Sequence, residues 1–298
     1  MPRNGSHDPG RERENGASGR VTGGPLRGPI IVLAYGYSGV DRLESILAGY
    51  PGLACTSGTG ILPLCAQAAA TWQRHERTTT GMSAIAASSV KALATTMITC
   101  ILAAGRGSRW CETATAAAPA GTFARLFPQA QFVCLYRACG PVIAEATRSA
   151  RWGLGDAGIA DFAAAYPGNS VAAVGAYWRA ATTALLDFET AHPGRSLRVR
   201  HEDLTADPAA AASAVVRFLG LDQHRPGLPA AAPQDLDLAA AGSSPDTGDG
   251  AEQIPAELIP APMLERINTL HARLGYPALA PGQEPELTGA AARLAGRG

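Results

Sequence analysis

A short glycine-containing turn near the start of the chain has the composition of an anion-binding site. Residues 36–39 (GYSG) follow the apolar run 30–34 and precede a helical pattern. Backbone N–H groups in such a turn, together with the positive N-terminal end of the next helix, attract phosphate or sulfate. Ser38 could add a hydroxyl, and Gly39 would let the backbone approach a ligand closely. Asp41 opposes an anion there unless Arg42 offsets its charge, and a turn that binds nothing is the alternative.

A second candidate is Arg137, which comes directly after the apolar run 132–136. Ligands of open α/β sheets bind at the carboxyl ends of the strands. The planar guanidinium group of arginine suits phosphate oxygens. The alternative is a strand-end arginine whose head reaches solvent. If the two apolar runs share one sheet, Arg137 and the turn 36–39 lie at the same edge.

Three side chains could act as a general base: His75, Glu112 and His201. His201 heads an HEDL segment, where a structural role is the alternative. Residues 55–60 (CTSGTG) combine hydroxyls with two glycines that could hold an anion, although a polar turn after a helix explains them equally simply. Six cysteines include no CxxC pair, so we expect small core residues and neither disulfides nor a metal site. Cys55 as a nucleophile has no partner base that the sequence identifies.

The elements that must position these groups alternate between strands and helices. Short apolar runs predict strands at 30–34, 132–136 and 196–200. Apolar residues at helical spacing, or a capping signal, predict helices at 41–48, at 63–76, at 82–104, from 141 onward, at 158–165, at 170–191, from 208 onward after the capping Asp207, and at 262–274. This alternation is typical of an α/β fold with a doubly wound, mostly parallel sheet flanked by helices.

The remaining segments lack such patterns. Residues 1–27 are predicted to be a disordered N-terminal arm, residues 28–277 the folded domain, and residues 278–298 a flexible C-terminal tail. Residues 201–208 (HEDLTADP) and 225–260 are predicted to be loops, the second one long and on the surface.

Bulk properties narrow the possible partners. The formal net charge of the 298 residues is zero, so no overall field recruits nucleic acid or an anionic membrane, and we expect neither as a partner. Lys91 is the single lysine, and it lies in a helical segment where a solvated position is the simpler explanation. The N-terminus lacks the apolar stretch of a secretory signal, and the apolar residues 93–104 are too few to span a bilayer. We therefore expect a cytoplasmic protein. The sequence does not indicate its oligomeric state.

Several blocks of the chain resemble the sulfotransferase family. Residues 29–51 (PIIVLAYGYSGVDRLESILAGYP) are similar to its 5′-phosphosulfate loop, and residues 124–146 (ARLFPQAQFVCLYRACGPVIAEA) to its 3′-phosphate segment. Residues 198–221 resemble its RYEDLLADP…FLGL block, and residues 267–277 its C-terminal helix. The resemblance implies a P-loop-like fold that binds 3′-phosphoadenosine 5′-phosphosulfate (PAPS). It also implies transfer of the sulfuryl group to a hydroxyl or amine of a small molecule.

Three positions match the family where it holds the donor, and a fourth candidate, Val40, follows them although its residue type is altered. Ser38 and Gly39 fall on the Ser-Gly whose backbone amides bind the 5′-phosphate, and Val40 would supply the next amide. Arg137 falls on the arginine that binds the 3′-phosphate. These matches imply that the two turns hold the two ends of one adenylate.

Other positions that carry chemistry in the family are altered. The basic residue of the loop is replaced by Tyr37, and the serine eight positions after the 3′-phosphate arginine is replaced by Glu145, whose charge would oppose a phosphate. The remaining altered positions, which include sites of a catalytic glutamate and of lysines, are Val40, Asp41, Gly58, Gly60, Thr113 and Gln253. Losing one charge-assisted contact in a transition state costs roughly 3–4 kcal/mol. Ordinary PAPS chemistry therefore needs substitutes.

Substitutes for the lost groups lie near the same segments. Tyr37 could donate a hydrogen bond to the leaving oxygen, and Arg42, one turn into the helix, could reach the phosphosulfate. Arg148 and Arg151 follow the 3′-phosphate segment. The leading hypothesis is sulfuryl transfer with Tyr37, Arg42 and Glu112 in catalytic roles. The alternatives keep the fold but use it for another group transfer or for binding without catalysis.

Overall fold

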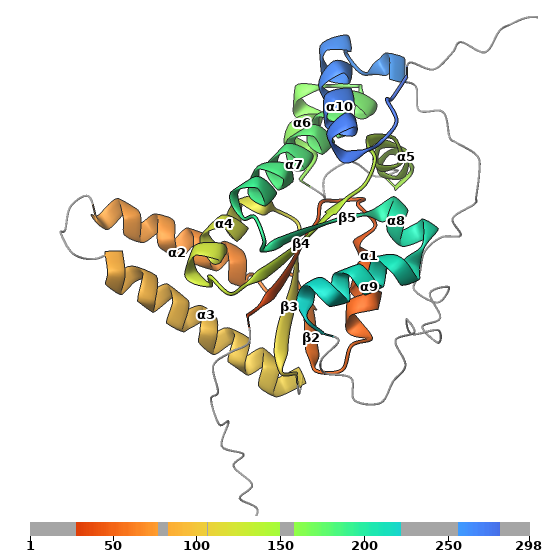
Figure 1. The fold of residues 1–298 in the computed structure, drawn as a ribbon. Helices are drawn as coiled ribbons and strands as arrows, with labels where there is room; N and C mark the ends of the chain where they lie inside the picture. The colour runs from red at the N-terminus through yellow and green to blue at the C-terminus, as the bar shows by residue number, and fades with distance from the viewer. Residues whose placement is uncertain (1–27, 77–82, 106, 150–157, 222–255, 281–298) are drawn as a thin grey trace, which may run out of the picture.

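A five-stranded parallel sheet forms the centre of the molecule (Figure 1). The computed structural model describes residues 28–76, 83–105, 107–149, 158–221 and 256–280. The strands follow the order β2-β3-β1-β4-β5, and every neighbouring pair is parallel. Their bounds are Ile30–Leu33 for β1, Leu53–Ser57 for β2, Arg109–Ala114 for β3, Gln131–Tyr136 for β4 and Ser196–Arg200 for β5. All five strands therefore end at the same edge of the sheet.

Helices cover both faces of this sheet (Figure 1): α1 to α7 lie in the connections between the parallel strands, whereas α8, α9 and α10 follow the last strand. One hydrophobic cluster joins Ile30 and Val32 of β1 to α1, α8 and α9. The other joins Ile31 and Leu33, on the opposite face, to α2, α3, α4, α5, α7 and α10. The helices are α1 Val40–Ala48, α2 Ile61–Glu76, α3 Ser83–Gly105, α4 Ala117–Leu126, α5 Cys139–Ser149, α6 Ala160–Ala165, α7 Ser170–Ala191, α8 His201–Ala206, α9 Pro208–Leu219 and α10 Ala261–Leu274, with a 3-10 turn, η2, at Ala256–Leu258.

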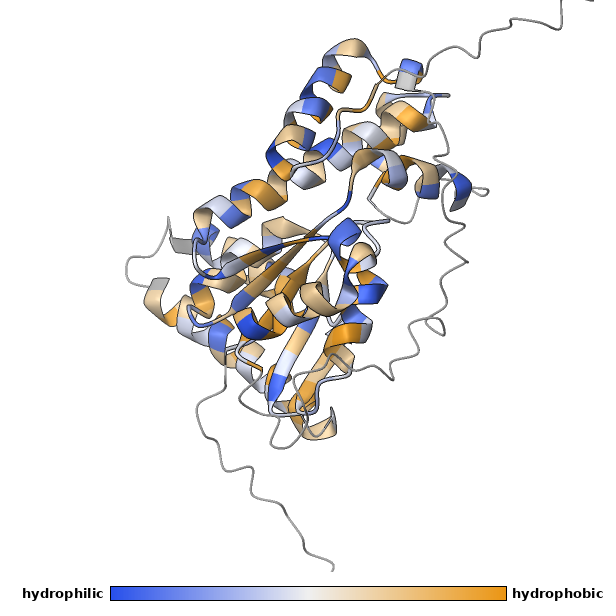
Figure 2. Cartoon of the chain, turned by 45° about the vertical axis from the view of Figure 1, so that its right-hand side comes forward, coloured by the Kyte–Doolittle hydropathy of each residue, from blue (hydrophilic) through white to orange (hydrophobic). Residues whose placement is uncertain are grey.

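The alternation of side chains along β1 explains its apolar sequence. Successive residues of a strand point to opposite faces, and both faces of this strand are covered, so all four of its residues are fully buried. Figure 2 shows the hydrophobic colour concentrated on the strands and on the helix sides that face them. The core therefore holds the carboxyl edge of β1 and β4 in a fixed position.

The structure confirms the predicted doubly wound sheet and corrects several segments. The strands at the first, fourth and fifth positions of the chain were predicted, whereas β2, β3 and α4 were not. Residues 55–57 belong to β2 and are not a turn after a helix. The predicted loop at HEDLTA is wrong, because these residues form the six-residue helix α8.

The apolar segment around residues 93–104 is longer than predicted. It belongs to α3, in which Ala84–Gly105 is 22 residues long and apolar enough to cross a membrane by length and composition. The sequence-based statement that it is too short was therefore wrong. A core helix of a soluble protein passes the same test, and α3 packs along β2 and β3 beside α2 and α4.

Some sequence-based predictions lie outside the described residues. They are the disordered arm at 1–27, residues 222–255 of the long loop, residues 281–298 of the tail, Arg151 and Gln253.

Candidate functional site

The turn between β1 and α1 combines an unpaired hydroxyl with an unusual backbone. Ser38 is 1% exposed, and its Oγ has no hydrogen-bond partner among the described residues. Tyr37 has a φ of 65°, in the left-handed region that non-glycine residues rarely adopt, and Gly39, the N-cap of α1, has a φ of 73°. A buried polar group without a partner costs free energy, and backbone strain of this kind gathers at ligand sites. The turn therefore has features of a binding site.

Gly39 is required by its neighbours as well as by its backbone. A Cβ atom at this position would lie 2.2 Å from Cδ2 and 2.4 Å from Nε2 of His201. The imidazole of His201 therefore lies directly against the turn. The first N–H groups of α1 have no partner within the helix, so they and the helix dipole favour an anion at this end.

Arg137 lies beside the turn because β4 is the neighbour of β1, with Leu33 opposite Cys134. The phenol of Tyr35 accepts from the N–H of Arg137 and donates to its carbonyl, both at 2.9 Å. The indole N–H of Trp178 donates to the same carbonyl at 2.8 Å. These bonds fix the backbone from which the arginine side chain extends.

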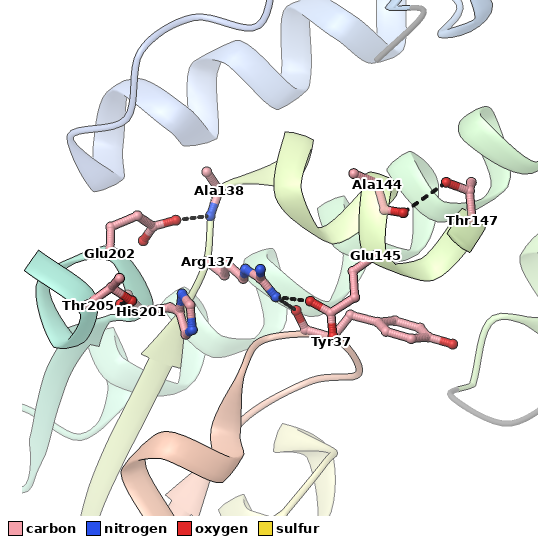
Figure 3. Close-up of polar contacts among 9 residues, drawn as sticks. All are labelled: Tyr37, Arg137, Ala138, Ala144, Glu145, Thr147, His201, Glu202 and Thr205. Atoms are coloured by element: carbon pink, nitrogen blue, oxygen red, sulfur yellow. Dashed lines mark hydrogen bonds and ion pairs between the residues drawn. The ribbon is translucent and has the colours of Figure 1, made fainter. Parts of the chain in front are cut away.

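The guanidinium of Arg137 joins the two turns. Its Nη1 donates to the carbonyl of Tyr37 at 2.9 Å and also pairs with Oε2 of Glu145, as Figure 3 shows. The Arg137 side chain is 16% exposed and that of Glu145 38% exposed. The turn after β1 and the strand end of β4 therefore lie at the same edge of the sheet, as expected if the two runs share one sheet, and they are in direct contact.

Helix α8 completes this edge with His201 and Glu202. Oε1 of Glu202 accepts from the N–H of Ala138 at 2.9 Å (Figure 3). Burial lowers the pKa of His201 below its ordinary value, and the positive charge of Arg137 lowers it further. His201 is therefore neutral at neutral pH, and its ring is a possible base that lies directly against the turn.

The other predicted residues occupy several positions. Val40 begins α1, next to the turn. The ring of Tyr37 extends away from Arg137 while its carbonyl faces it (Figure 3). Nη1 of Arg42 donates to the carbonyl of Leu204 in α8 at 3.4 Å, so this guanidinium is directed toward α8.

Two basic residues discussed in the sequence analysis, Arg148 and Lys91, lie at exposed positions. Arg148 is exposed in the last turn of α5. Lys91 is exposed on α3, and its Nζ lies 5.8 Å from the ring centroid of Phe127, which places it in the helix layer beside α4. The side chain of His75 lies outside the described residues.

Glu112 lies on β3 beneath the loop that joins β2 to α2. Its carboxylate accepts from the N–H and the hydroxyl of Thr59, both at 2.9 Å, and from the hydroxyl of Thr56. The indole N–H of Trp110 donates to that same hydroxyl at 2.8 Å. Glu112 is only 3% exposed, so these contacts give it a structural task. Its catalytic role stays a prediction.

Comparison with known proteins agrees with this arrangement. A model of the sulfotransferase family matches residues 29–225. The chain belongs to the sulfotransferase family. No curated protein matches it, which is consistent with a divergent member of the family.

Solved sulfotransferase structures share the fold at low sequence identity. The sulfotransferase domain from the curacin biosynthetic pathway is 16% identical with a TM-score of 0.52, and the alignment covers 85% of this chain and 99% of that one. The sulfotransferase domain from the Synechococcus PCC 7002 olefin synthase is 19% identical with a TM-score of 0.51, covering 85% and 98%. At such identities the likeness establishes the fold alone.

Sequence reasoning missed the groups that support this sulfotransferase site from a distance. Tyr177 of α7 accepts from the N–H of Gly36 at 2.7 Å, although the two residues are 141 positions apart. Tyr35, Trp178 and Glu202 act on the strand end of β4 in a similar way. Only Glu202 carried a signal, because it stands in the HEDL block that resembles the family.

Proposed function

We propose that this protein transfers a sulfuryl group from an adenylate donor to a small-molecule acceptor at the edge formed by the β1–α1 turn and Arg137. The observation that carries the proposal is the buried hydroxyl of Ser38, just before the N-cap of α1, which finds no hydrogen-bond partner in the described part of the chain. It stands beside free helix N–H groups, where phosphate or sulfate oxygens would satisfy all of these donors. Cytoplasmic location belongs to the same proposal.

The residues present fit one end of PAPS and not the other. At the turn, the orphaned hydroxyl of Ser38 and the glycine backbone of Gly39 suit the phosphosulfate. At the other end, the guanidinium of Arg137 is already paired with the carboxylate of Glu145, so a 3′-phosphate would meet a negative charge. A phosphosulfate donor supplies cleavage of its bridging S–O bond, in which the nucleotide phosphate leaves, and formation of an S–O bond to a hydroxyl acceptor or an S–N bond to an amine acceptor, whose proton is released.

Within this proposal, each residue has a defined task. The amides of Gly39 and Val40, with Ser38, would hold the phosphosulfate, and the neutral imidazole of His201 would exclude water from the turn and accept a proton. Arg42 extends toward α8 and would act only after a change of side-chain rotamer. Tyr37 would need a similar change.

The serine hydroxyl gives the decisive test. We expect Ser38→Ala to weaken nucleotide binding by about 10- to 100-fold, since a hydrogen bond to a charged group is worth roughly 1.5–3 kcal/mol. The folded protein should be as stable as the wild type or more stable, because the variant removes an unsatisfied buried hydroxyl. Titration calorimetry measures the binding, and urea denaturation the stability.

Two nucleotides and one control make this test specific. The probes are 3′-phosphoadenosine 5′-phosphate (PAP), the spent form of PAPS, and AMP, the spent form of adenosine 5′-phosphosulfate. Ser196→Ala is the matched control, because Ser196 also has an unpaired buried Oγ but lies at the opposite end of the sheet, at the start of β5. If neither nucleotide binds the wild type at millimolar concentration, the proposed function is wrong.

A second candidate function is nucleotide binding without sulfuryl transfer. It is favoured by Tyr37, Gly58 and Thr113, which stand where the family resemblance expects charged residues. Nucleotide binding that is lost in Ser38→Ala, together with no sulfated product from either phosphosulfate donor over a panel of hydroxyl and amine acceptors, would favour this candidate.

A further inference from the structure

The ion pair between Arg137 and Glu145 changes what this end of the site can bind. Glu145 lies on α5, eight residues after Arg137, and its Oε2 contacts Nη1 of the guanidinium. The same Nη1 donates to the carbonyl of Tyr37 at 2.9 Å. A ligand phosphate that approached the guanidinium would therefore share it with a carboxylate. The negative charges of the phosphate and of the half-buried Glu145 carboxylate would then repel each other strongly.

The charged groups around this point cancel one another. The groups that act on the neighbouring His201 are two cations, Arg137 and Arg42, and two carboxylates, Glu145 and Glu202. A phosphosulfate at the β1–α1 turn would use the helix N-terminus and Ser38, which do not depend on this balance. A further dianion beside Arg137 would meet as many carboxylates as cations among these groups.

A carboxylate and an arginine side by side suit a sugar hydroxyl better than a sugar phosphate. In dinucleotide-binding folds an acidic residue accepts a hydrogen bond from a ribose hydroxyl, and an arginine takes its place where the ribose carries a phosphate. A hydroxyl can donate to Glu145 and accept from Arg137, whereas a phosphate can only accept. The pair of Glu145 and Arg137 thus offers a hydroxyl both an acceptor and a donor of hydrogen bonds.

From this chemistry we propose that the site selects a nucleotide with a free ribose 3′-hydroxyl, such as adenosine 5′-phosphosulfate, and that Glu145 is the residue that excludes a 3′-phosphate. The inference rests on the proposed function, because it specifies the donor of that same site. Glu145 is here a specificity-determining residue that would contact the ribose.

The test compares AMP with PAP by titration calorimetry on the wild type and on Glu145→Ser and Glu145→Gln. We expect the wild type to bind AMP at least tenfold more tightly than PAP. Glu145→Ser removes the charge and frees the guanidinium, so this variant should bind PAP at least tenfold more tightly than AMP. Glu145→Gln keeps the shape and a hydrogen bond to Arg137, and it should raise the affinity for PAP while leaving that for AMP within about threefold.

One control and a check of folding accompany these variants. Glu265→Gln on α10 removes one negative charge at an exposed position and should leave the ratio of the two affinities unchanged. Thermal denaturation verifies that each variant is folded. Should Glu145→Ser not fold, Glu145→Gln decides alone, because its side chain has nearly the same size.

The possible outcomes separate this inference from the function on which it rests. A wild type that binds PAP as tightly as AMP, or more tightly, overturns the selection of a free 3′-hydroxyl and leaves the nucleotide site intact. Equal ratios in the wild type and both Glu145 variants overturn the role of Glu145. Absence of binding for both nucleotides in all of these proteins overturns the proposed function, and the inference with it.

Discussion

His271 illustrates how one buried side chain links the C-terminal helix to the site. Its Nε2 accepts from the N–H of Cys139, at the start of α5, at 3.1 Å. Its Nδ1 lies 2.6 Å from the carbonyl of Pro277, which can only accept, so Nδ1 carries the proton. A second proton on Nε2 would remove the bond to Cys139. The ring is therefore bound in its neutral form.

This arrangement predicts a loss of stability in mild acid. Burial lowers the pKa of His271 below its ordinary value of 6.5 and outweighs the carbonyl of Pro277 and the charge of Glu202, which raise it. The unfolded chain therefore binds the proton more readily than the folded chain does, and stability falls as the pH drops through about 6.5. His201, whose pKa is also lowered, adds to the same trend.

Urea denaturation at about pH 7.5 and at about pH 5.5, on either side of the ordinary histidine pKa, measures this effect. His271→Gln should lose less stability between the two pH values than the wild type does, although it is less stable at the higher one. His192→Gln, a control at the C-cap of α7, should still show the loss of stability that His271 causes. An identical loss in the wild type and in His271→Gln would show that His271 does not contribute.

The loop between β2 and α2 depends on Glu112, and its stability distinguishes a structural from a catalytic role. Replacing Glu112 by alanine leaves the N–H and hydroxyl of Thr59 and the hydroxyl of Thr56 without their acceptor. We expect Glu112→Ala to lower the free energy of unfolding by about 3 kcal/mol, because hydrogen bonds to a charged acceptor are worth roughly 1.5–3 kcal/mol each. Denaturation in urea gives the value.

A double-mutant cycle with Thr59→Val sharpens this result. If Glu112 mainly anchors the loop, the two substitutions should be strongly non-additive, since each removes the same contacts. A catalytic role without a structural one predicts the reverse pattern: unchanged stability in Glu112→Ala and additive effects in the cycle.

The elements that the sequence could predict are those whose residues carry a pattern of their own. The run IIVL of β1 and the spacing of Leu43, Ile46 and Leu47 in α1 are local signals. The sequence RWCETA of β3 is not, because Arg109 and Glu112 are buried only through bonds to distant residues such as Gln131 and Thr59. The six-residue helix α8 is too short to show a period.

The site follows the same rule. Family-like spacing located Ser38, Gly39 and Arg137 at one edge, because β1 and β4 are adjacent. The sequence indicated that the charge of Glu145 would oppose a phosphate, but it could not show that this carboxylate pairs with Arg137. The contact of Glu145 with Arg137 depends on how α5 continues from the strand end, which only the folded chain determines.

At the scale of the whole molecule, the family match and the fold do not end together. The match stops at residue 225, yet α10 packs against α7 beyond it and sends His271 to the start of α5. Ile267 and Met263 of α10 approach Gly175 of α7, where a Cβ would be 3.5 Å from each. The C-terminal helix thus packs into the same hydrophobic core and supports the segment that follows Arg137.

Helix α3 raises the question of where the whole molecule resides, since its length and composition permit a membrane span. Two alanines on this helix separate the possibilities. Ala94 is 1% exposed in the stripe that faces the core, whereas Ala92 points outward. If α3 is a layer of a water-exposed fold, Ala94→Asp should destabilise by about 3 kcal/mol or more through a buried unpaired charge. Ala92→Asp should stay within about 0.5 kcal/mol of the wild type.

Urea denaturation of the detergent-free protein measures the effect of both substitutions on the free energy of unfolding. A protein that is recovered only with membranes, and in which the two substitutions are equally harmful, would assign α3 to a bilayer instead, since lipid penalises a charge on either side of the helix.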